Sequence, residues 1–266
     1  MFETPDGQEF YVFDCHTHMG ESPMFETYDL PFRFGPDQMS ALMAENGIDA
    51  VCGFSPRIYG SDYDQVNTRN IEGAKEKHKG RIFPVLRFNP NQPWEIEERL
   101  TRYAKMGAVG IKLHPIADGT YVVNHHPLIF LLLEHAGPAG IRLVLIHTGG
   151  HWCTTPALVA DLAMHFPDLQ FIIGHSGLHG LHYEAITFAR RLENLWLDTS
   201  GLEIPHFVTE MVRGVGEERV LFGSDAPFGS FRMEVEKIAL EAKLTEQQVR
   251  AVLGENMKRL INLASN

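Results

Sequence analysis

Eight short runs of apolar, β-branched or aromatic residues recur along this chain at intervals of 25 to 40 residues, with helical patterns between them. A strand that alternates with a helix at this spacing is typical of a parallel sheet. Residues 143–146 and 171–173 are apolar without alternation, as in strands that are covered on both faces. The spacing predicts strands over residues 10–14, 50–54, 82–88, 108–112, 142–147, 169–174, 195–199 and 220–224.

Eight such units favour a closed (β/α)8 barrel, that is a TIM barrel, over an open doubly wound sheet. Barrels of about 250 residues are routinely one domain, and no linker or low-complexity tract divides these 266 residues. An open sheet that binds a dinucleotide carries a G-x-G-x-x-G motif after its first strand, and this sequence has none there. We therefore expect one somewhat distorted barrel domain over residues 1–266.

Three helix starts and one irregular segment are also predicted. Helices are expected to begin at Pro93 and Pro156, because proline fits the first turn of a helix. A capping box at Thr245 marks a third start. Residues 20–35, which follow the first strand, show no clear period. This segment is either a lid at the rim of the barrel or a packed surface loop.

The composition argues against several classes of protein. A formal net charge of −11 disfavours general nucleic-acid binding, which needs a basic face. Three cysteines are too few, and an odd number, for a disulfide framework. The first residues show no signal-peptide pattern, and no apolar stretch is long enough to cross a membrane. We expect a cytoplasmic homo-oligomer that acts on a small molecule and binds neither nucleic acid nor membrane.

Side chains that bind metals follow the predicted strands, at the end where barrel enzymes keep their chemistry. His16 and His18 share one side of the chain, because residues two apart in a strand point the same way. If that side is the barrel axis, the two imidazoles converge as metal ligands do. Each residue alone also fits a structural role, such as a hydrogen-bonded histidine or a helix-capping aspartate. Their repetition favours a metal site at His16, His18, Lys112, His147, His175 and Asp225.

Lys112 ends the fourth predicted strand and allows three interpretations. Burial lowers the pKa of a lysine and leaves a neutral amine. A neutral amine can add carbon dioxide to form a carbamate, an anion able to bridge two cations. Alternatively, Lys112 pairs with a carboxylate such as Asp14 or Asp225, or it holds the substrate.

The pattern of these six residues on their strands resembles the amidohydrolase superfamily. Several segments are similar to its branch that contains aminocarboxymuconate semialdehyde decarboxylase and many metal-dependent hydrolases. The resemblance extends from Asp14 to Leu263. The similar segments are Asp14-x-His16-x-His18, residues 110–115, 174–177 and 224–227, and residues 254–260.

The resemblance implies a barrel that holds one or two divalent ions, most often zinc, at the open end of the strands. The histidine pair of the first strand would bind one ion together with Asp225. With one ion, His147 is the next ligand and His175 lies near the water or substrate. With two ions, a carboxylated Lys112 bridges them, and His147 and His175 hold the second. Manganese and iron also suit such mixed ligands.

A site of this kind predicts hydrolysis of an ester, lactone or amide bond. A divalent ion lowers the pKa of bound water and polarises a carbonyl. Asp225 would take the proton of that water, and His175 would assist or stabilise the developing oxyanion. Both residues are therefore expected to be catalytic.

Further residues at the strand ends and in the loops point to the substrate. Arg57 follows the second predicted strand and Arg87 lies at the end of the third, where they grip a substrate carboxylate or form ordinary ion pairs. His114 shares its parity with Lys112 and is also expected to face the mouth. The loops place Trp152 and His179 among the candidate contacts. Together these residues predict a small carboxylated substrate, cyclic or aromatic in character.

Two other functions fit the same residues. A non-oxidative decarboxylase of a small cyclic or aromatic carboxylic acid uses the same barrel with one ion. A non-catalytic barrel, stabilised by metal and used for binding, is the other. Asp225 argues against the second alternative, because a binding module has no need of a poised base.

Overall fold

The protein is described by a computed structural model that covers residues 1–92 and 95–264. Its centre is an eight-stranded sheet in the order β12-β11-β10-β9-β8-β7-β6-β3, and the neighbouring strands pair in parallel. The predicted (β/α)8 barrel is confirmed. The strands are β3 Phe13–His18, β6 Ala50–Phe54, β7 Ile82–Arg87, β8 Gly110–Leu113, β9 Leu143–Gly149, β10 Gln170–Leu178, β11 Leu195–Asp198 and β12 Val220–Leu221.

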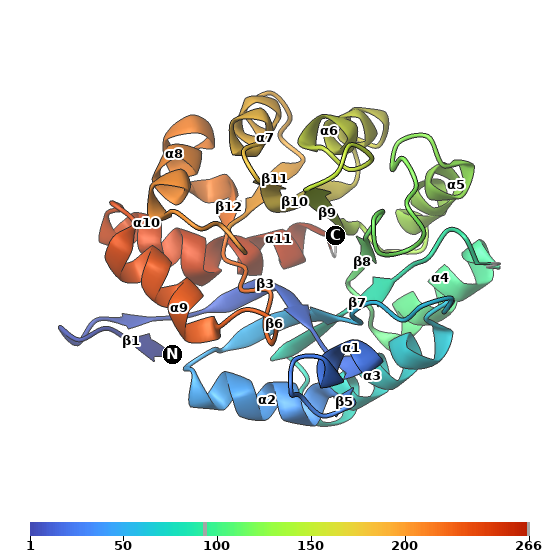
Figure 1. Ribbon diagram of the computed structural model, residues 1–266, viewed down its shortest axis with the longest axis horizontal. Coiled ribbons are helices and arrows are strands. Elements are labelled where there is room, and N and C mark those ends of the chain that lie inside the picture. Colours follow the sequence, from blue (N-terminus) through green and yellow to red (C-terminus); the bar gives the residue numbers. More distant parts are fainter. Residues whose placement is uncertain (93–94, 265–266) are drawn as a thin grey trace.

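Helices surround the strands (Figure 1). Among the described residues, none of them is long and apolar enough to cross a membrane. A hairpin of β1 Phe2–Glu3 and β2 Glu9–Phe10 precedes the barrel. The helices between strands are α2 Pro36–Glu45, α3 Asp64–Lys77, α4 Ile96–Met106, α5 Pro127–Ala136, α6 Pro156–His165, α7 His182–Ala189 and α8 Pro205–Val215, and those after β12 are α9 Phe231–Glu236, α10 Glu246–Arg250 and α11 Asn256–Ala264.

Backbone hydrogen bonds between β3 and the segment after β12 close the barrel. The N–H of Cys15 donates to the carbonyl of Phe222 at 2.9 Å, and the N–H of His18 donates to that of Ala226 at 2.7 Å. Between them, the N–H of Asp225 donates to the carbonyl of His16 at 2.9 Å. The closure therefore brings Asp225 beside two histidines that lie more than 200 residues earlier in the chain.

The inside of the barrel changes from apolar at its base to polar at its mouth. Val85 of β7 and Leu145 of β9 lie in a buried apolar cluster with Met257 of α11. Arg87 and His147 each come two residues later on the same strands. Because residues two apart in a strand share a side, these polar residues continue the inner rows toward the mouth.

Most predicted strand limits differ from the structure by one or more residues, and the first and last strands matter most for the site. The first strand begins at Phe13 rather than at residue 10, because Phe10 pairs with Phe2 in the β1–β2 hairpin. His16 and His18 consequently lie within β3 instead of after it. The last strand is shorter than predicted and ends at Leu221, since the next backbone N–H, that of Phe222, donates to the carbonyl of Val252 outside the sheet.

The predicted helix starts have different outcomes. Pro156 begins α6, and the capping box at Thr245 is present: its side chain accepts from the N–H of Gln248 at 3.3 Å. Pro93 lies outside the described residues, and the helix that follows it begins at Ile96. Residues 20–35 form β4 Gly20–Glu21, the short helix α1 Pro23–Glu26 and β5 Arg33–Phe34.

Candidate metal centre

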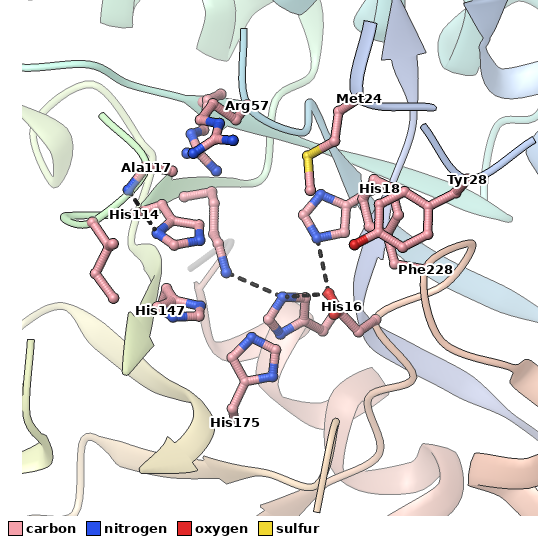
Figure 2. A pocket seen from close by; sticks show the side chains of 14 residues that line it. His16, His18, Met24, Tyr28, Arg57, His114, Ala117, His147, His175 and Phe228 are labelled. Carbon is pink, nitrogen blue, oxygen red and sulfur yellow. Dashed lines mark hydrogen bonds and ion pairs between the residues drawn. The ribbon is translucent and has the colours of Figure 1, made fainter. Parts of the chain in front are cut away.

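A cavity of about 220 Å³ opens at the mouth of the barrel (Figure 2). All six residues of the predicted metal site line it, as do the predicted substrate contacts Arg57, Arg87 and His114. Trp152 and His179 do not line it. Trp152 is 66% exposed, and His179 borders a separate, smaller cavity. The remaining lining residues are Met24, Tyr28, Ile116, Ala117 and Phe228.

Three of the predicted ligands converge on one point. Nε2 of His18 lies 2.9 Å from Oδ1 of Asp225, and Nε2 of His16 lies 3.4 Å from the same oxygen. The three ligand atoms are all within 4.8 Å of one another. Ligands that are each about 2.0–2.2 Å from one zinc ion lie roughly 3–3.5 Å apart. The donor set and its spacing therefore fit a divalent cation.

Asp198, at the end of β11, orients His16. Its Oδ2 accepts from Nδ1 of His16 at 2.7 Å, from the backbone N–H of His175 at 2.8 Å and from the hydroxyl of Ser200 at 2.6 Å. Although burial opposes ionisation, the neighbouring His16 and these hydrogen bonds hold the pKa of Asp198 below its usual range. Because Nδ1 of His16 carries the proton and donates it in a hydrogen bond to Asp198, Nε2 keeps a lone pair for a metal.

His16, His175 and Asp198 form a second group whose ligand atoms lie within 4.8 Å of one another. We interpret this group as an orienting network, because Asp198 already hydrogen-bonds the ring of His16 and the backbone N–H of His175. Asp198 and Ser200 are absent from the predicted site. Asp198 does end a predicted strand, so the rule that selected the other residues could have found it.

The two predicted catalytic residues have unusual backbones. Asp225 has a φ of 61° and His175 a φ of 60°. This left-handed region is uncommon for residues other than glycine and costs of order 1–3 kcal/mol. The hydrogen bonds to the carbonyl of His16 and to the carboxylate of Asp198 hold these backbones in place. Burial disfavours the charge of Asp225, but the hydrogen bond from His18 and nearby histidines lower its pKa.

Lys112 is completely buried and lines the same cavity as the histidines and Arg87. Its Nζ is 3.1 Å from Nε2 of His16 and 4.7 Å from the ring centre of Phe54. Burial, and next the charge of Arg87, lower the pKa of Lys112 to about 7. Among the described residues, Lys112 forms no ion pair with Asp14 or Asp225.

Asp14 has a structural role instead. Its Oδ1 accepts from the backbone N–H groups of His16 at 2.8 Å and Ser224 at 3.2 Å. Burial raises the pKa of Asp14 well above its usual value. Asp14 thereby ties β3 to the segment that carries Asp225.

His147 lies at the cavity but beside another histidine. Its ring stacks on that of His114, with centres 3.8 Å apart and planes at 12°, and lies 4.8 Å from the ring of His175. Within the part of the chain that the structure describes, neither group of converging ligands includes His147. Burial, followed by neighbouring histidines and Lys112, lowers the pKa of both His114 and His147 well below the usual value.

Arg87 is buried and is one of the residues that line the cavity. Its Nε donates to Oδ2 of Asp118 at 3.0 Å, and the hydroxyl of Tyr63 donates to Oδ1 of the same carboxylate at 2.7 Å. Nη1 of Arg87 is buried without a hydrogen-bond partner. Arg57, less buried, stacks on Tyr59 with 4.2 Å between its guanidinium carbon and the ring centre. Asp118 is a further residue that the predicted site lacks.

An aromatic surface covers the other side of the cavity. The ring of Phe228 lies 5.0 Å from His18 and 4.9 Å from Tyr28, and it stacks on the buried Phe25. Met24, Phe25 and Tyr28 come from residues 20–35, so this segment is part of the barrel rim. Met24 and Tyr28 were not predicted, because an irregular segment gives no period from which to infer where its side chains point.

Solved structures share this fold. A 5-carboxyvanillate decarboxylase from Sphingomonas paucimobilis is 17% identical, with a TM-score of 0.69 over 96% of this chain and 99% of that one. A putative 2-pyrone-4,6-dicarboxylic acid hydrolase from Pseudomonas putida is 18% identical, with a TM-score of 0.71 over 96% and 99%. A dihydroxybenzoic acid decarboxylase from Polaromonas, with bound manganese and 2-nitroresorcinol, is 15% identical, with a TM-score of 0.72 over 96% and 98%.

At these identities the likeness establishes the fold alone. No curated protein matches the chain. A family model described as amidohydrolase matches residues 13–263, which include all six residues of the predicted metal site. The chain therefore belongs to the amidohydrolase family.

Proposed function

We propose that this protein is a metal-dependent hydrolase that cleaves an ester, lactone or amide bond of a small carboxylated substrate. The observation that carries the proposal is the convergence of His16, His18 and Asp225 in a cavity that two arginine side chains also line. A divalent ion bound there supplies an activated water and polarises a carbonyl. Zinc is the first expectation, and manganese suits the same ligands.

The chain's own residues have separate roles in this proposal. Asp225, ionised at neutral pH, accepts the proton of the attacking water and returns it to the leaving group. Nδ1 of His175 lies 3.3 Å from the carbonyl oxygen of Ser200 and 2.9 Å from its hydroxyl. Because a carbonyl oxygen only accepts, Nδ1 of His175 carries the proton and its Nε2 keeps a lone pair. His175 is therefore set up to bind a metal ion or accept a proton, and not to donate a hydrogen bond to an oxyanion. His147 is a further proposed ligand, since its ring nitrogens have no hydrogen-bond partner among the described residues.

The cavity suggests the class of substrate. Arg57 and the free Nη1 of Arg87 offer charged donors to a carboxylate. Phe228 and Tyr28 offer aromatic faces against which a ring can pack. A volume of about 220 Å³ suits a molecule of roughly one ring with its substituents.

Non-oxidative decarboxylation of a cyclic or aromatic carboxylic acid is the second candidate. It is favoured by the names of two similar structures, a carboxyvanillate and a dihydroxybenzoic acid decarboxylase, and by the way His16, His18 and Asp225 suit one ion. In this reaction Arg57 and Arg87 orient the ring acid, and a protonated side chain returns a proton to the carbon that loses carbon dioxide.

A substrate panel separates these candidates. Zinc- or manganese-loaded protein is incubated with carboxylated lactones, esters and amides and with hydroxybenzoates, and both acid release and carbon dioxide release are measured. The proposal predicts acid release, lost in Asp225→Asn and retained in Asp168→Asn, an exposed control. Release of carbon dioxide instead of acid would show that the protein is a decarboxylase and would contradict the proposed hydrolysis. No turnover by fully loaded protein favours a binding barrel, and turnover by Asp225→Asn contradicts both enzymatic readings.

A further inference from the structure

His114 is held in one orientation at the edge of the cavity. It directly follows β8, and its ring stacks on His147. Its Nδ1 accepts a hydrogen bond of 3.3 Å from the backbone N–H of Ala117. The carbonyl of His114 accepts from the N–H of Asp118 at 3.1 Å, so the backbone of the same turn is fixed as well. The ring therefore has little freedom to rotate.

These contacts determine which nitrogen of His114 carries a proton. A backbone N–H only donates, so Nδ1 must hold a lone pair. The proton of the neutral ring is then on Nε2. Among the residues that the structure describes, Nε2 has no hydrogen-bond partner, and His114 lines the cavity. The ring thus offers an N–H group that no protein atom uses.

His16 and His175 have the opposite arrangement. Nδ1 of His16 faces the carboxylate of Asp198, and Nδ1 of His175 faces the carbonyl of Ser200. Both rings therefore keep their lone pairs on Nε2, as metal ligands require. Figure 2 shows His114 across the cavity from His16 and His18. Histidines on one side of the cavity thus present a lone pair, whereas His114 on the other side presents a hydrogen-bond donor.

We propose that His114 is a substrate-contacting residue that donates its Nε2–H to an oxygen of the substrate, either a carbonyl or a carboxylate oxygen, and is neither a base nor a metal ligand. This inference rests on the proposed function. A fixed donor stabilises an oxygen on which negative charge develops, because it needs no reorganisation during the reaction. The pKa of His114, lowered first by burial, is consistent with a neutral ring.

Two substitutions separate the donor from the ring. Gln at position 114 places an amide N–H near the position of Nε2, whereas Met fills similar space without a donor. On a substrate found in the panel, His114→Met is expected to lower kcat/KM by about 10²–10³-fold and His114→Gln by less than about tenfold. Both variants should bind zinc as the unchanged protein does. His165→Met, at an exposed position of α6, controls for loss of a histidine.

Imidazole ¹⁵N NMR provides a readout that needs no turnover. With His114→Gln used to assign the signal, the zinc-loaded protein should show a protonated Nε2 and an unprotonated Nδ1 at residue 114. A protonated Nδ1, loss of zinc in His114→Met, or equal kcat/KM in His114→Met and the unchanged protein each overturns the proposal. Protein that binds zinc but turns over nothing in the panel overturns the proposed function and, with it, the role of His114 toward the substrate. The NMR result still shows which nitrogen of His114 carries the proton, because that measurement needs no turnover.

Discussion

The two sides of the cavity differ in how their polar groups are satisfied. On the ligand side, formed by β3, β10 and the segment after β12, Asp198 and Asp14 hold His16 and the backbone around it. On the donor side, formed by β7 and β8, Nη1 of Arg87 has no hydrogen-bond partner among the described residues, while Nζ of Lys112 lies 3.1 Å from Nε2 of His16. Each side thus keeps unpartnered atoms, since Oδ2 of Asp14 and Nδ1 of His18 on the ligand side also lack a hydrogen-bond partner among the described residues. The sides differ in that Asp198 orients the ring of His16, whereas Nη1 of Arg87 keeps a charged donor that a bound molecule can use.

The largest expected effect tests the donor side. In Arg87→Met, the buried carboxylate of Asp118 loses its charge partner, and the free energy of unfolding should fall by about 3–5 kcal/mol. Arg232→Met removes an exposed pair with Glu236 and should cost less than about 1 kcal/mol. Urea denaturation measures both. Equal losses of stability in the two variants would mean that the buried Arg87–Asp118 pair stabilises the fold no more than the exposed Arg232–Glu236 pair does.

The next effect tests the ligand side. Asp198→Asn removes the carboxylate that holds Nδ1 of His16, and it should weaken zinc binding by about 10- to 100-fold. Asp168→Asn, an exposed change of the same kind, should leave the affinity unchanged. Competition with a chelator dye measures the two affinities. If both variants bind zinc as tightly as the unchanged protein, Asp198 does not orient a ligand.

The third test concerns the pH dependence of stability without metal. The pKa of Lys112 is lowered to about 7 in the folded chain, mainly by burial, and stays near 10.5 when the chain unfolds. Between these values the unfolded chain binds one more proton, so this group makes stability rise with pH, by at most about 1.4 kcal/mol per unit.

Lys112→Met removes the titrating group and should flatten this rise between pH 7 and 10 in guanidinium denaturation of metal-free protein. Lys258→Met, at an exposed position of α11, should keep the slope of the unchanged protein. Identical slopes in all three proteins would contradict a neutral Lys112 in the folded chain.

Much of the fold and of the cavity lining was predictable because both depend on where parallel strands end. Strand ends meet at one mouth, so His147 and Asp225 could be placed together without coordinates. The start of β3 was not predictable, since an apolar run does not reveal that Phe10 pairs with Phe2 in a hairpin.

Partners across strands were also beyond the sequence. Nothing near Arg87 in the chain indicates that Asp118 neutralises it, 31 residues later. The loop residues Trp152 and His179 were predicted as substrate contacts only because their loops follow strands, and neither lines the cavity. The position of a residue in a loop does not determine where its side chain points.

The most direct test of the account is an anomalous diffraction map of zinc-loaded crystals, recorded at the zinc absorption edge. The account predicts a peak at the barrel mouth, about 2.0–2.2 Å from Nε2 of His16, Nε2 of His18 and a carboxylate oxygen of Asp225. A map with no peak there, or with zinc only at surface histidines, would contradict the assignment of a metal centre.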